Sequence, residues 1–543
     1  MSKGSTYIAG SPSYAQHSFA QVPTNNGPRS VFNRSHTHKT TFDEGYLIPF
    51  YVDEALPGDT FNLNMTALIR LNTLLNPIMD NLYFETQFWF VPNRLLWTNW
   101  IYMCGEQNNP ADSTSFTVPQ VTVPGGGFAA LSLFDYMGIP TAQATMNRPN
   151  ALHSRAYNLI YNNCYRDQNL QNSVTVDTGN GPDNSANYVL KRRGKRHDYF
   201  TSALPWPQKI NDGGSTSVGL SGTAPVTGIG LSGTATIGTN GTVRDSTGNL
   251  AVNYANYAQS TGGNPLLLIS GNSTTTSYPQ IFANLAAATG FTINALRQSI
   301  QIQRMYERDA RGGTRYPEII KSHFGVTSPD YRLQRPEFLG GGSQLIDIHT
   351  VPQTSGSGIT GQTTAQADLA AYGATVARGH GFTKSFTEHG VILGICSVRA
   401  DLTYQQGMSR MWTRQTRWDF AWPTLTHLGE QAVLNQEIYL SGNTATDSAV
   451  FGYQERYAEY RYKPALVTGE FRSNYVQTLD AWHLAQNFAS LPTLNDTFIV
   501  ENAPMSRILA SGAVTHFLLD AHFTLKCARP MPTYAVPGLM DHF

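Results

Sequence analysis

FNLNMTALIRL, residues 61–71, is the stretch that decides the fold. Its apolar residues stand at every second position, while polar residues such as Asn62 and Arg70 fill most of the gaps. A period of two places the two sets on opposite faces of a β-strand. One face of this strand is therefore expected to pack in a core, and the other is expected to carry polar side chains.

Two neighbouring segments alternate in the same way. Residues 46–52 come before the central stretch, across the turn LPGD at 56–59, and residues 82–90 come after it. In the turn, Pro fixes φ and Gly allows a positive φ. Three consecutive strands of this regularity predict an antiparallel sheet with at least one packed face.

The far end of the chain carries an equally regular strand. In residues 517–527, Phe517, Phe523 and Cys527 are among the alternate residues expected to face inward, and residues 391–404 alternate as well. Regular strands near both ends, with long irregular stretches between them, predict a mainly β protein. The predicted fold is an eight-stranded antiparallel jelly roll, a β-sandwich with long loop insertions and a few helices. The early strands are expected to pair with the last one.

Composition divides the chain further. Residues 1–41 are rich in Ser, Asn and Pro and have no apolar period, so they are predicted to form an N-terminal arm. Residues 42–543 are predicted to form the jelly-roll domain. Within it, residues 211–278 are dominated by Gly, Ser, Thr and Asn, which predicts an insertion of short strands that forms a surface protrusion. Its isolated apolar residues include Leu220, Val226, Ile229, Leu231 and Ile237.

Other segments have weaker patterns. Apolar spacing predicts helices at residues 131–137, 151–164 and 279–311. Residues 332–381 contain a run of three glycines and are predicted to be loop. Residues 453–463 alternate aromatic and charged side chains, which is typical of an edge or interface strand.

The chain has few charges for its size. Of 543 residues only 14% are charged, against roughly 25% in ordinary soluble domains, and 37 basic residues balance 37 acidic ones. Aromatic residues make up 11%. Two interpretations fit this composition equally well: a large β protein with polar, uncharged loops, or a subunit whose surface is mostly interface with other chains.

The sequence carries no pattern of catalytic chemistry. The motifs of serine hydrolases, zinc proteases and nucleotide-binding loops are missing. The cysteines are far apart, at Cys104, Cys164, Cys396 and Cys527, and form no metal-binding cluster. The sequence therefore predicts no enzyme, no cofactor and no metal. A polar N-terminus, and no run near the ~20 apolar residues that cross a bilayer, predict a soluble protein without membrane insertion.

Residues 191–197, KRRGKRH, hold the densest charge in the chain. The aromatic residues Tyr199, Phe200 and Trp206 follow, and this mixture is used by sites for single-stranded nucleic acid to contact phosphates and stack on bases. A solvated loop face explains the run equally well, so both interpretations stay open.

Long, irregular segments carry a resemblance to a known family. They include ERDARGGTRYPEI at 307–319 and SVRADLTYQQGMSRMW at 397–412, and others lie at 32–63, 79–97, 193–209, 335–344, 427–439, 452–464 and 527–538. In these segments the sequence resembles the major capsid protein of microviruses of the gokushovirus type, which are small icosahedral bacteriophages with single-stranded DNA. Residues 211–278 fit the family by position and composition only.

The resemblance implies a viral jelly roll that assembles with copies of itself into a closed T=1 shell around a single-stranded DNA genome. It implies that the insertion builds protrusions at the threefold axes that touch a receptor on the bacterial host surface. It implies a further partner, a small basic DNA-binding virion protein. It also implies that the protein resides in the virion and is assembled in the host cytoplasm. A free-standing phage fibre or receptor-binding protein, and a secreted carbohydrate-binding β protein, are the alternatives.

Basic residues become candidates for DNA contact once a shell around DNA is expected. Arg and Lys contacts to phosphate, with aromatic stacking, would bind DNA at the inner surface. The candidates are Arg29, Arg34, Lys39, Lys191, Arg192, Arg193, Lys195, Arg196, Arg410, Arg414 and Arg417. Zero net charge predicts a modest patch, with the small basic protein or polyamines neutralising most phosphates.

Overall fold

The computed structural model describes residues 28–207, 209, 293–355, 357–359, 362–364, 366–511 and 515–534, together with short strands between residues 226 and 283. The chain divides into two compact units. Residues 1–207 and 314–543 form the first unit, and residues 208–313 form the second.

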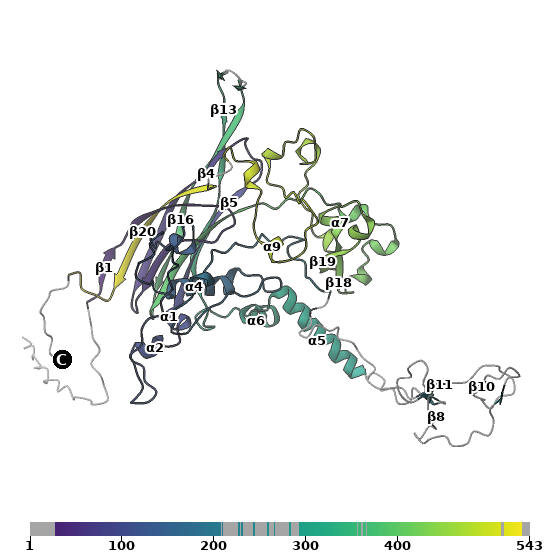
Figure 1. The fold of residues 1–543 in the computed structure, drawn as a ribbon, viewed down its shortest axis with the longest axis horizontal. Coiled ribbons are helices and arrows are strands. Elements are labelled where there is room, and N and C mark those ends of the chain that lie inside the picture. Colours follow the sequence, from purple (N-terminus) through teal and green to yellow (C-terminus); the bar gives the residue numbers. More distant parts are fainter. Residues whose placement is uncertain are drawn as a thin grey trace, which may run out of the picture. The chain divides into compact units, whose positions relative to one another are not determined.

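The first unit is built on two antiparallel sheets whose long strands run side by side (Figure 1). The larger sheet has the order β1 (Ser30–Asn33), β20 (Phe517–Arg529), β4 (Thr60–Leu74), β16 (Leu369–Ser385) and β13 (Asp347–Pro352), and β2 (His36–Phe42) also pairs with β20. The smaller sheet has the order β12 (Glu337–Leu345), β5 (Leu82–Pro92), β17 (Gly390–Ala400) and β3 (Ile48–Ala55).

One hydrophobic core joins the two sheets. Every second residue of β4, from Phe61 to Leu71, is buried, and β20 shows the same alternation from Phe517 to Cys527. Aromatic rings meet across the layers, for example Phe50 and Phe523 at 5.6 Å between centroids. The prediction of a mainly β, antiparallel jelly-roll sandwich is therefore confirmed. The two sheets hold six and four strands among the described residues, so the predicted count of eight is not confirmed.

The three early strands do not lie in one sheet, and this prediction was wrong. β4 pairs with β20 and β16, whereas β3 and β5 both pair with β17 in the other sheet. The expectation that all early strands pair with the last one fails for the same reason. Alternation shows which side chains face a core, but it does not show on which side of the core a strand lies.

Residues 30–42 belong to the larger sheet rather than to an arm. β2 pairs with β20 from His36 opposite Phe523 to Phe42 opposite Phe517. Its sequence HTHKTTF has a polar residue at nearly every position, so it lacks an apolar period. Its place in the sheet comes from the backbone hydrogen bonds to β20. The boundary predicted at residue 41 is therefore corrected for this part, and residues 1–27 lie outside the described residues.

The glycine-rich stretch predicted as loop contains the strands β12, β13 and β16. Glycine is needed there because the backbones approach closely. A Cβ at Gly341 would lie 2.1 Å from the Thr86 carbonyl oxygen, and one at Gly340 would lie 2.3 Å from the Gly381 carbonyl oxygen. A run of glycines thus marks tight packing here, although the same residues are common in loops.

Two of the predicted helices are found in the first unit. They are α3 (Leu133–Tyr136) and α4 (Leu152–Ile160), and a π-helical turn at Tyr161–Tyr165 continues α4. The predicted edge strand at 453–463 is wrong in its second half, since β19 ends at Glu455 and a 3-10 turn follows at Ala458–Tyr460. The other elements of this unit are α1 (Asn93–Leu96), α2 (Trp100–Met103), α6 (Tyr316–Phe324), β14 (Ser357–Ile359), β15 (Gln362–Thr364), β18 (Glu430–Leu434), α7 (Asn435–Ile438), α8 (Thr444–Asp447), β19 (Val450–Glu455) and α9 (Asp496–Ile499).

The second unit contains helix α5 (Ile293–Gly312) and three short strand pairs. The helix predicted from residue 279 begins later, because Phe282–Ala283 form strand β11. The pairs are β6 (Val226–Thr227) with β11, β7 (Gly230–Leu231) with β8 (Val243–Arg244), and β9 (Ala258–Gln259) with β10 (Pro265–Leu266). Val226 and Leu231 lie in these strands, whereas Leu220, Ile229 and Ile237 lie outside the described residues. A protrusion formed by residues 211–278 stays a prediction.

Gly341→Ala tests the close approach of β12 to β5. We expect the free energy of unfolding to fall by about 2 kcal/mol, because the added Cβ would overlap a backbone oxygen that cannot move without shifting the strand. Denaturant unfolding of the purified chain measures this. Gly126→Ala is the control, since nothing lies within 4 Å of a Cβ there. Equal stabilities of the two variants would contradict the explanation.

Candidate nucleic-acid interface

The basic run at 191–196 forms ion pairs with Glu85 of β5. The Arg399 guanidinium donates to both Glu85 carboxylate oxygens at 2.8 Å, Arg193 forms an ion pair with the same carboxylate, and Arg196 lies 3.4 Å from it. The Glu85 side chain is only 10% exposed. Burial alone would raise the pKa of Glu85, but the positive charges of Arg193, Arg399 and Arg196 lower it below its ordinary value.

The other side chains of the run also have partners within the subunit. Lys195 is buried, with its ammonium 4.4 Å from the centre of the Phe498 ring, and burial lowers its pKa. Arg192 lies 4.2 Å from the ring centre of Tyr46. Arg196 stacks 4.1 Å over Tyr83, and Lys191 is half-buried.

The assignment of Arg193 and Lys195 to a DNA-facing set is therefore corrected. Arg193, with a side chain 12% exposed, is held by Glu85 and by a 2.8 Å hydrogen bond to the Ser397 hydroxyl. A charge that is both buried and paired inside the subunit is not accessible to a phosphate outside it. For Lys191, Arg192 and Arg196, which keep part of their surface exposed, DNA contact stays a prediction.

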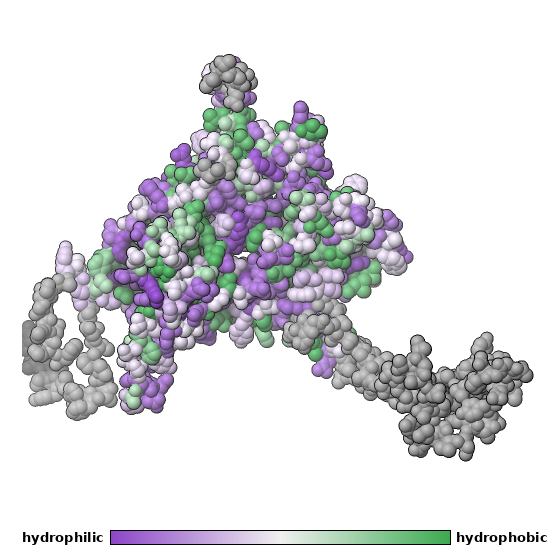
Figure 2. Space-filling view, viewed as in Figure 1, coloured by the Kyte–Doolittle hydropathy of each residue, from purple (hydrophilic) through white to green (hydrophobic). Residues whose placement is uncertain are grey.

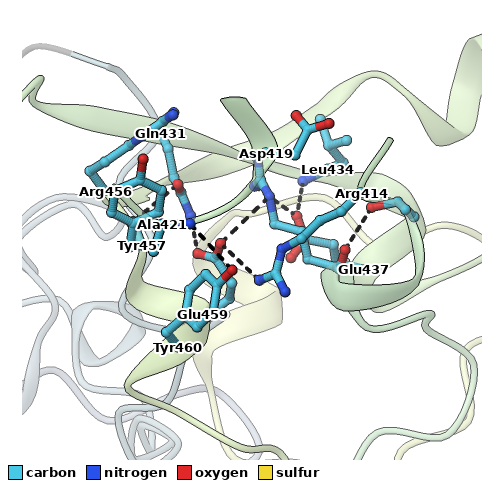
Figure 3. A network of polar contacts seen from close by, with 12 residues as sticks. Arg414, Asp419, Ala421, Gln431, Leu434, Glu437, Arg456, Tyr457, Glu459 and Tyr460 are labelled. Atoms are coloured by element: carbon cyan, nitrogen blue, oxygen red, sulfur yellow. Dashed lines mark hydrogen bonds and ion pairs between the residues drawn. The ribbon is translucent and has the colours of Figure 1, made fainter. Parts of the chain in front are cut away.

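Arg410 and Arg414 are also paired with carboxylates. Arg410 donates to the Ala432 carbonyl at 2.6 Å and lies 3.3 Å from Glu437. Arg414 lies 3.4 Å from Glu459 and stacks 4.1 Å over Tyr460, as part of the network in Figure 3. Arg417 differs, since it is exposed and stacks on tryptophan rings.

The candidates near the N-terminus lie beside the larger sheet. The Arg34 guanidinium donates a bidentate pair of hydrogen bonds to the Asp53 carboxylate, at 2.7 and 2.9 Å. Arg29 is exposed and donates to the Thr60 hydroxyl at 2.5 Å, and Lys39 is exposed on β2. Arg29 and Lys39 therefore remain available at the solvent face of this sheet.

The larger sheet has one side that points away from the core of the subunit, and we call this side the outer face of the sheet. It brings polar and basic residues together. The strand register places Thr66 of β4 between His522 of β20 and Arg378 of β16. Because directly opposed residues point to the same side, all three lie on one face. The same face carries Asn33, Thr37, Lys39, Asn62, Asn64, Leu68, Arg70, Thr383, Leu518, Asp520, Thr524 and Lys526.

Basic residues outnumber acidic ones on the outer face. Among the strand residues of this face Lys39, Arg70, Arg378 and Lys526 are exposed, and exposed Arg29 directly precedes β1. Among the described strand residues of this face the acidic side chains are Asp347 and Asp520, and Asp520 lies 3.3 Å from Lys39. The chain as a whole is neutral, so the outer face concentrates positive charge.

A groove of about 710 Å³ borders the outer face where α3 meets β2, β4 and β20. Leu68, Leu131 and Leu518 give it apolar walls, and its charged lining residues are Lys39 and Arg70 with Asp135 and Asp520. Apolar walls beside basic groups suit a base and its phosphate better than they suit a small charged metabolite.

Three exposed basic residues of this surface were not among the predicted DNA contacts. Arg70 and Lys526 fill polar gaps in the two most regular strands, so the alternation already places them outward. Only the pairing of β4 with β20 shows that Arg70 and Lys526 lie on the same face of the sheet. Arg378 lies in the glycine-rich stretch predicted as loop, where no periodicity was apparent.

The fold narrows the class of protein. Double-sheet jelly rolls are shared by virus coat subunits, lectins and cupins. Among the described residues there is no group of three or more side chains that could hold a metal ion, and no helix with the length and apolar character to cross a membrane. The outer face is a broad charged surface rather than a catalytic pocket, which favours a coat subunit within this class.

Sequence comparisons identify the family. The family model described as "Capsid protein (F protein)" matches residues 20–539, and the chain belongs to this family. It is 47% identical to capsid protein VP1 of Bdellovibrio phage phiMH2K, over 97% of this chain and 98% of that protein. It is 45% identical to capsid protein VP1 of Chlamydia phage 1, with the same coverage, and 37% identical to that of Spiroplasma virus 4, over 96% and 97%.

The resemblance to microvirus capsid proteins of the gokushovirus type is thereby confirmed. The chain is a structural subunit of a virion, not an enzyme, and it assembles into a shell of many subunits.

Glu85→Gln tests the ion cluster beneath the basic run. We expect a loss of about 3 kcal/mol in the free energy of unfolding at pH 7, because three guanidinium groups lose their shared counter-charge. The folded-state pKa of Glu85 is lowered, so ionised Glu85 stabilises the fold above its unfolded pKa of about 4.3, and this contribution is lost as the pH falls through the folded pKa.

Denaturant unfolding at pH 7 and in acid measures the difference between wild type and variant. The difference should shrink in acid, where wild-type Glu85 is also neutral. Asp520→Asn is the control, because its ion pair with Lys39 is exposed and should contribute no more than about 0.5 kcal/mol. A Glu85→Gln effect as small as that of the control would contradict the assignment.

Proposed function

We propose that this chain is the repeating subunit of a closed T=1 icosahedral shell that packages single-stranded DNA, with the outer face of the larger sheet turned toward the DNA. The observation that supports this best is the excess of basic residues on one flat face of a chain whose total charge is zero. Phosphate contact needs such an excess, and a neutral subunit can supply it only by concentrating its charges.

The side chains of the outer face suit a flexible strand without sequence preference. Arg70, Arg378 and Lys526 provide charged contacts to phosphates, while Asn and Thr residues between them provide hydrogen bonds. Toward the β13 edge, Tyr372 is 42% exposed and stacks on His349 at 5.2 Å, which offers a platform for a base.

The small number of free basic groups implies help from another component. A genome carries one negative charge per nucleotide, and the outer face cannot neutralise most of them. A small basic virion protein or polyamines would supply the remaining positive charge. The proposal places assembly in the cytoplasm of the host bacterium, where genome and subunits meet.

The insertion at residues 211–278 is the proposed contact with a receptor on the host surface. It lies within the second compact unit, while the core that holds the sheets together lies in the first. A loop of this length adds little to the cost of closing the chain, on the order of 0.6 kcal/mol for each doubling. Its length can therefore vary at little cost to the stability of the subunit fold.

Replacing Arg70, Arg378 and Lys526 together by Gln tests the DNA-facing surface. We expect subunits that fold and assemble but package less DNA. For single-stranded DNA bound to purified subunits, the slope of log affinity against log salt should fall by about 2, since each phosphate contact contributes ~0.7. Sedimentation should show wild-type particles of megadalton mass whose DNA resists nuclease until the shell is opened.

The matched control replaces Lys321, Arg332 and Lys463 by Gln, which removes the same charge from exposed residues outside the outer face. If both triple variants lower DNA content equally, the outer face is not the DNA surface. A wild-type chain found only in fibres or as free subunits would instead contradict the shell.

Replacing residues 211–278 by a short Gly/Ser linker tests the role of the insertion in host contact. We expect soluble subunits with an unchanged unfolding midpoint, shells of normal size, and loss of attachment to host cells measured by co-sedimentation. A deleted chain that is insoluble would mean that the insertion is needed for folding. Full attachment by the deleted shells would contradict the role in host contact.

A further inference from the structure

The segment between residues 411 and 422 exposes an unusual amount of aromatic surface. Trp412 is 72% exposed, Trp418 61% and Phe420 50%. Met411 and Trp422 are exposed as well, and we call these five residues the aromatic patch. Figure 2 shows hydrophobic residues mixed with hydrophilic ones at the surface of the lobe where Figure 1 labels α7, β18 and β19. A large aromatic surface of this kind in a soluble subunit indicates a binding surface.

The backbone of the segment is held in one conformation. The Asp419 carboxylate accepts hydrogen bonds from the backbone N–H groups of Gln415 and Thr416 at 3.0 and 2.7 Å, and from the Thr416 hydroxyl at 2.9 Å. The Trp422 indole N–H donates to the Arg417 carbonyl at 3.0 Å. The aromatic side chains therefore stand on an ordered scaffold, which lowers the entropy lost when a partner binds.

A charged network beneath the segment attaches it to the rest of the lobe (Figure 3). Arg414 lies 3.4 Å from Glu459, and Gln431 of β18 donates to the same carboxylate. Arg410 lies 3.3 Å from Glu437, whose carboxylate also accepts the Leu434 N–H at 2.9 Å. The network uses the charges of Arg410 and Arg414 for support, so they are not offered to a phosphate.

The chemistry of the patch favours a protein partner. Its exposed basic side chain, Arg417, lies 4.7 Å from the ring centre of Trp422 and 5.5 Å from that of Trp418. Tryptophan with a stacked arginine is typical of the residues that contribute most to protein–protein binding, whereas DNA-binding surfaces carry an excess of basic groups. Asp419 balances Arg417, so the segment has little net charge to offer DNA.

We infer that the aromatic patch is the surface through which one subunit binds a second copy of this chain in the shell. The inference rests on the proposed shell, because the shell makes copies of this chain the neighbours of every subunit. Copies of a neutral chain do not repel one another, and a near-neutral apolar patch matches such a neighbour in charge. Closed symmetry then requires each copy to carry the surface that receives the patch.

Trp412→Ser and Trp418→Ser, singly and together, test the contact. Both side chains are exposed, so the variants should remain soluble and unfold at the wild-type midpoint. The subunit concentration at which half of the chain sediments as shells should rise at least tenfold. Val189→Ser is the control, since Val189 is 53% exposed outside the patch, and it should assemble as wild type does. Normal assembly of the double variant would overturn this inference but would not contradict the shell proposal.

Two further experiments separate a second copy from DNA. Arg417→Lys keeps the charge but loses the planar stacking group, so a protein contact should weaken while a phosphate contact should persist. A photoreactive benzoylphenylalanine in place of Trp412 should crosslink assembled shells into adducts of twice the 59.7 kDa chain mass. Adducts with DNA, or no adducts in intact shells, would overturn the inference. A wild-type chain that forms no shells would overturn the shell proposal as well.

Discussion

The pairing of β4 with β20 is the interaction on which the rest of the structure depends. The two strands are far apart in the chain but run in register from Leu71 opposite Phe517 to Thr60 opposite Ala528. Because side chains alternate, this one pairing sends phenylalanines and leucines into the core and sends Arg70, Thr66 and their partners to the solvent. A slip of one residue would exchange the two sets and would destroy the core and the basic face together.

Charge in this subunit serves two separate purposes. Inside, Glu85 and the arginines around it join the run at 191–196 to the smaller sheet, and Glu437 and Glu459 do the same for the lobe that carries the aromatic patch. Outside, a few basic residues remain on the larger sheet. A chain with only 37 basic residues that commits so many of them to internal pairs keeps few for the surface, and this agrees with a modest DNA contact.

The sequence predicts the inward and outward residues of single strands well, and it predicts their neighbours poorly. The alternation at Phe61–Leu71 and Phe517–Cys527 matches the burial, yet it contains no sign that β3 and β4 belong to different sheets. The density of charge at 191–196 did not reveal that Arg193 is paired inside the subunit, because its partner carboxylate belongs to Glu85, more than a hundred residues away in sequence. Arg378 was missed because glycines needed for close packing resemble those of a loop. In each case the missing information is a contact between distant segments.

The place of β20 in the larger sheet has a consequence for synthesis. β20 lies between β2, near the start of the described residues, and β4, and of the described strands it is the last to leave the ribosome. Until it arrives, β4 has an open edge, and core residues such as Phe50 lack their contact with Phe523. A polypeptide that stops before residue 517 cannot close its sandwich. Closure of the sandwich therefore comes late in synthesis, only after β20 has been made.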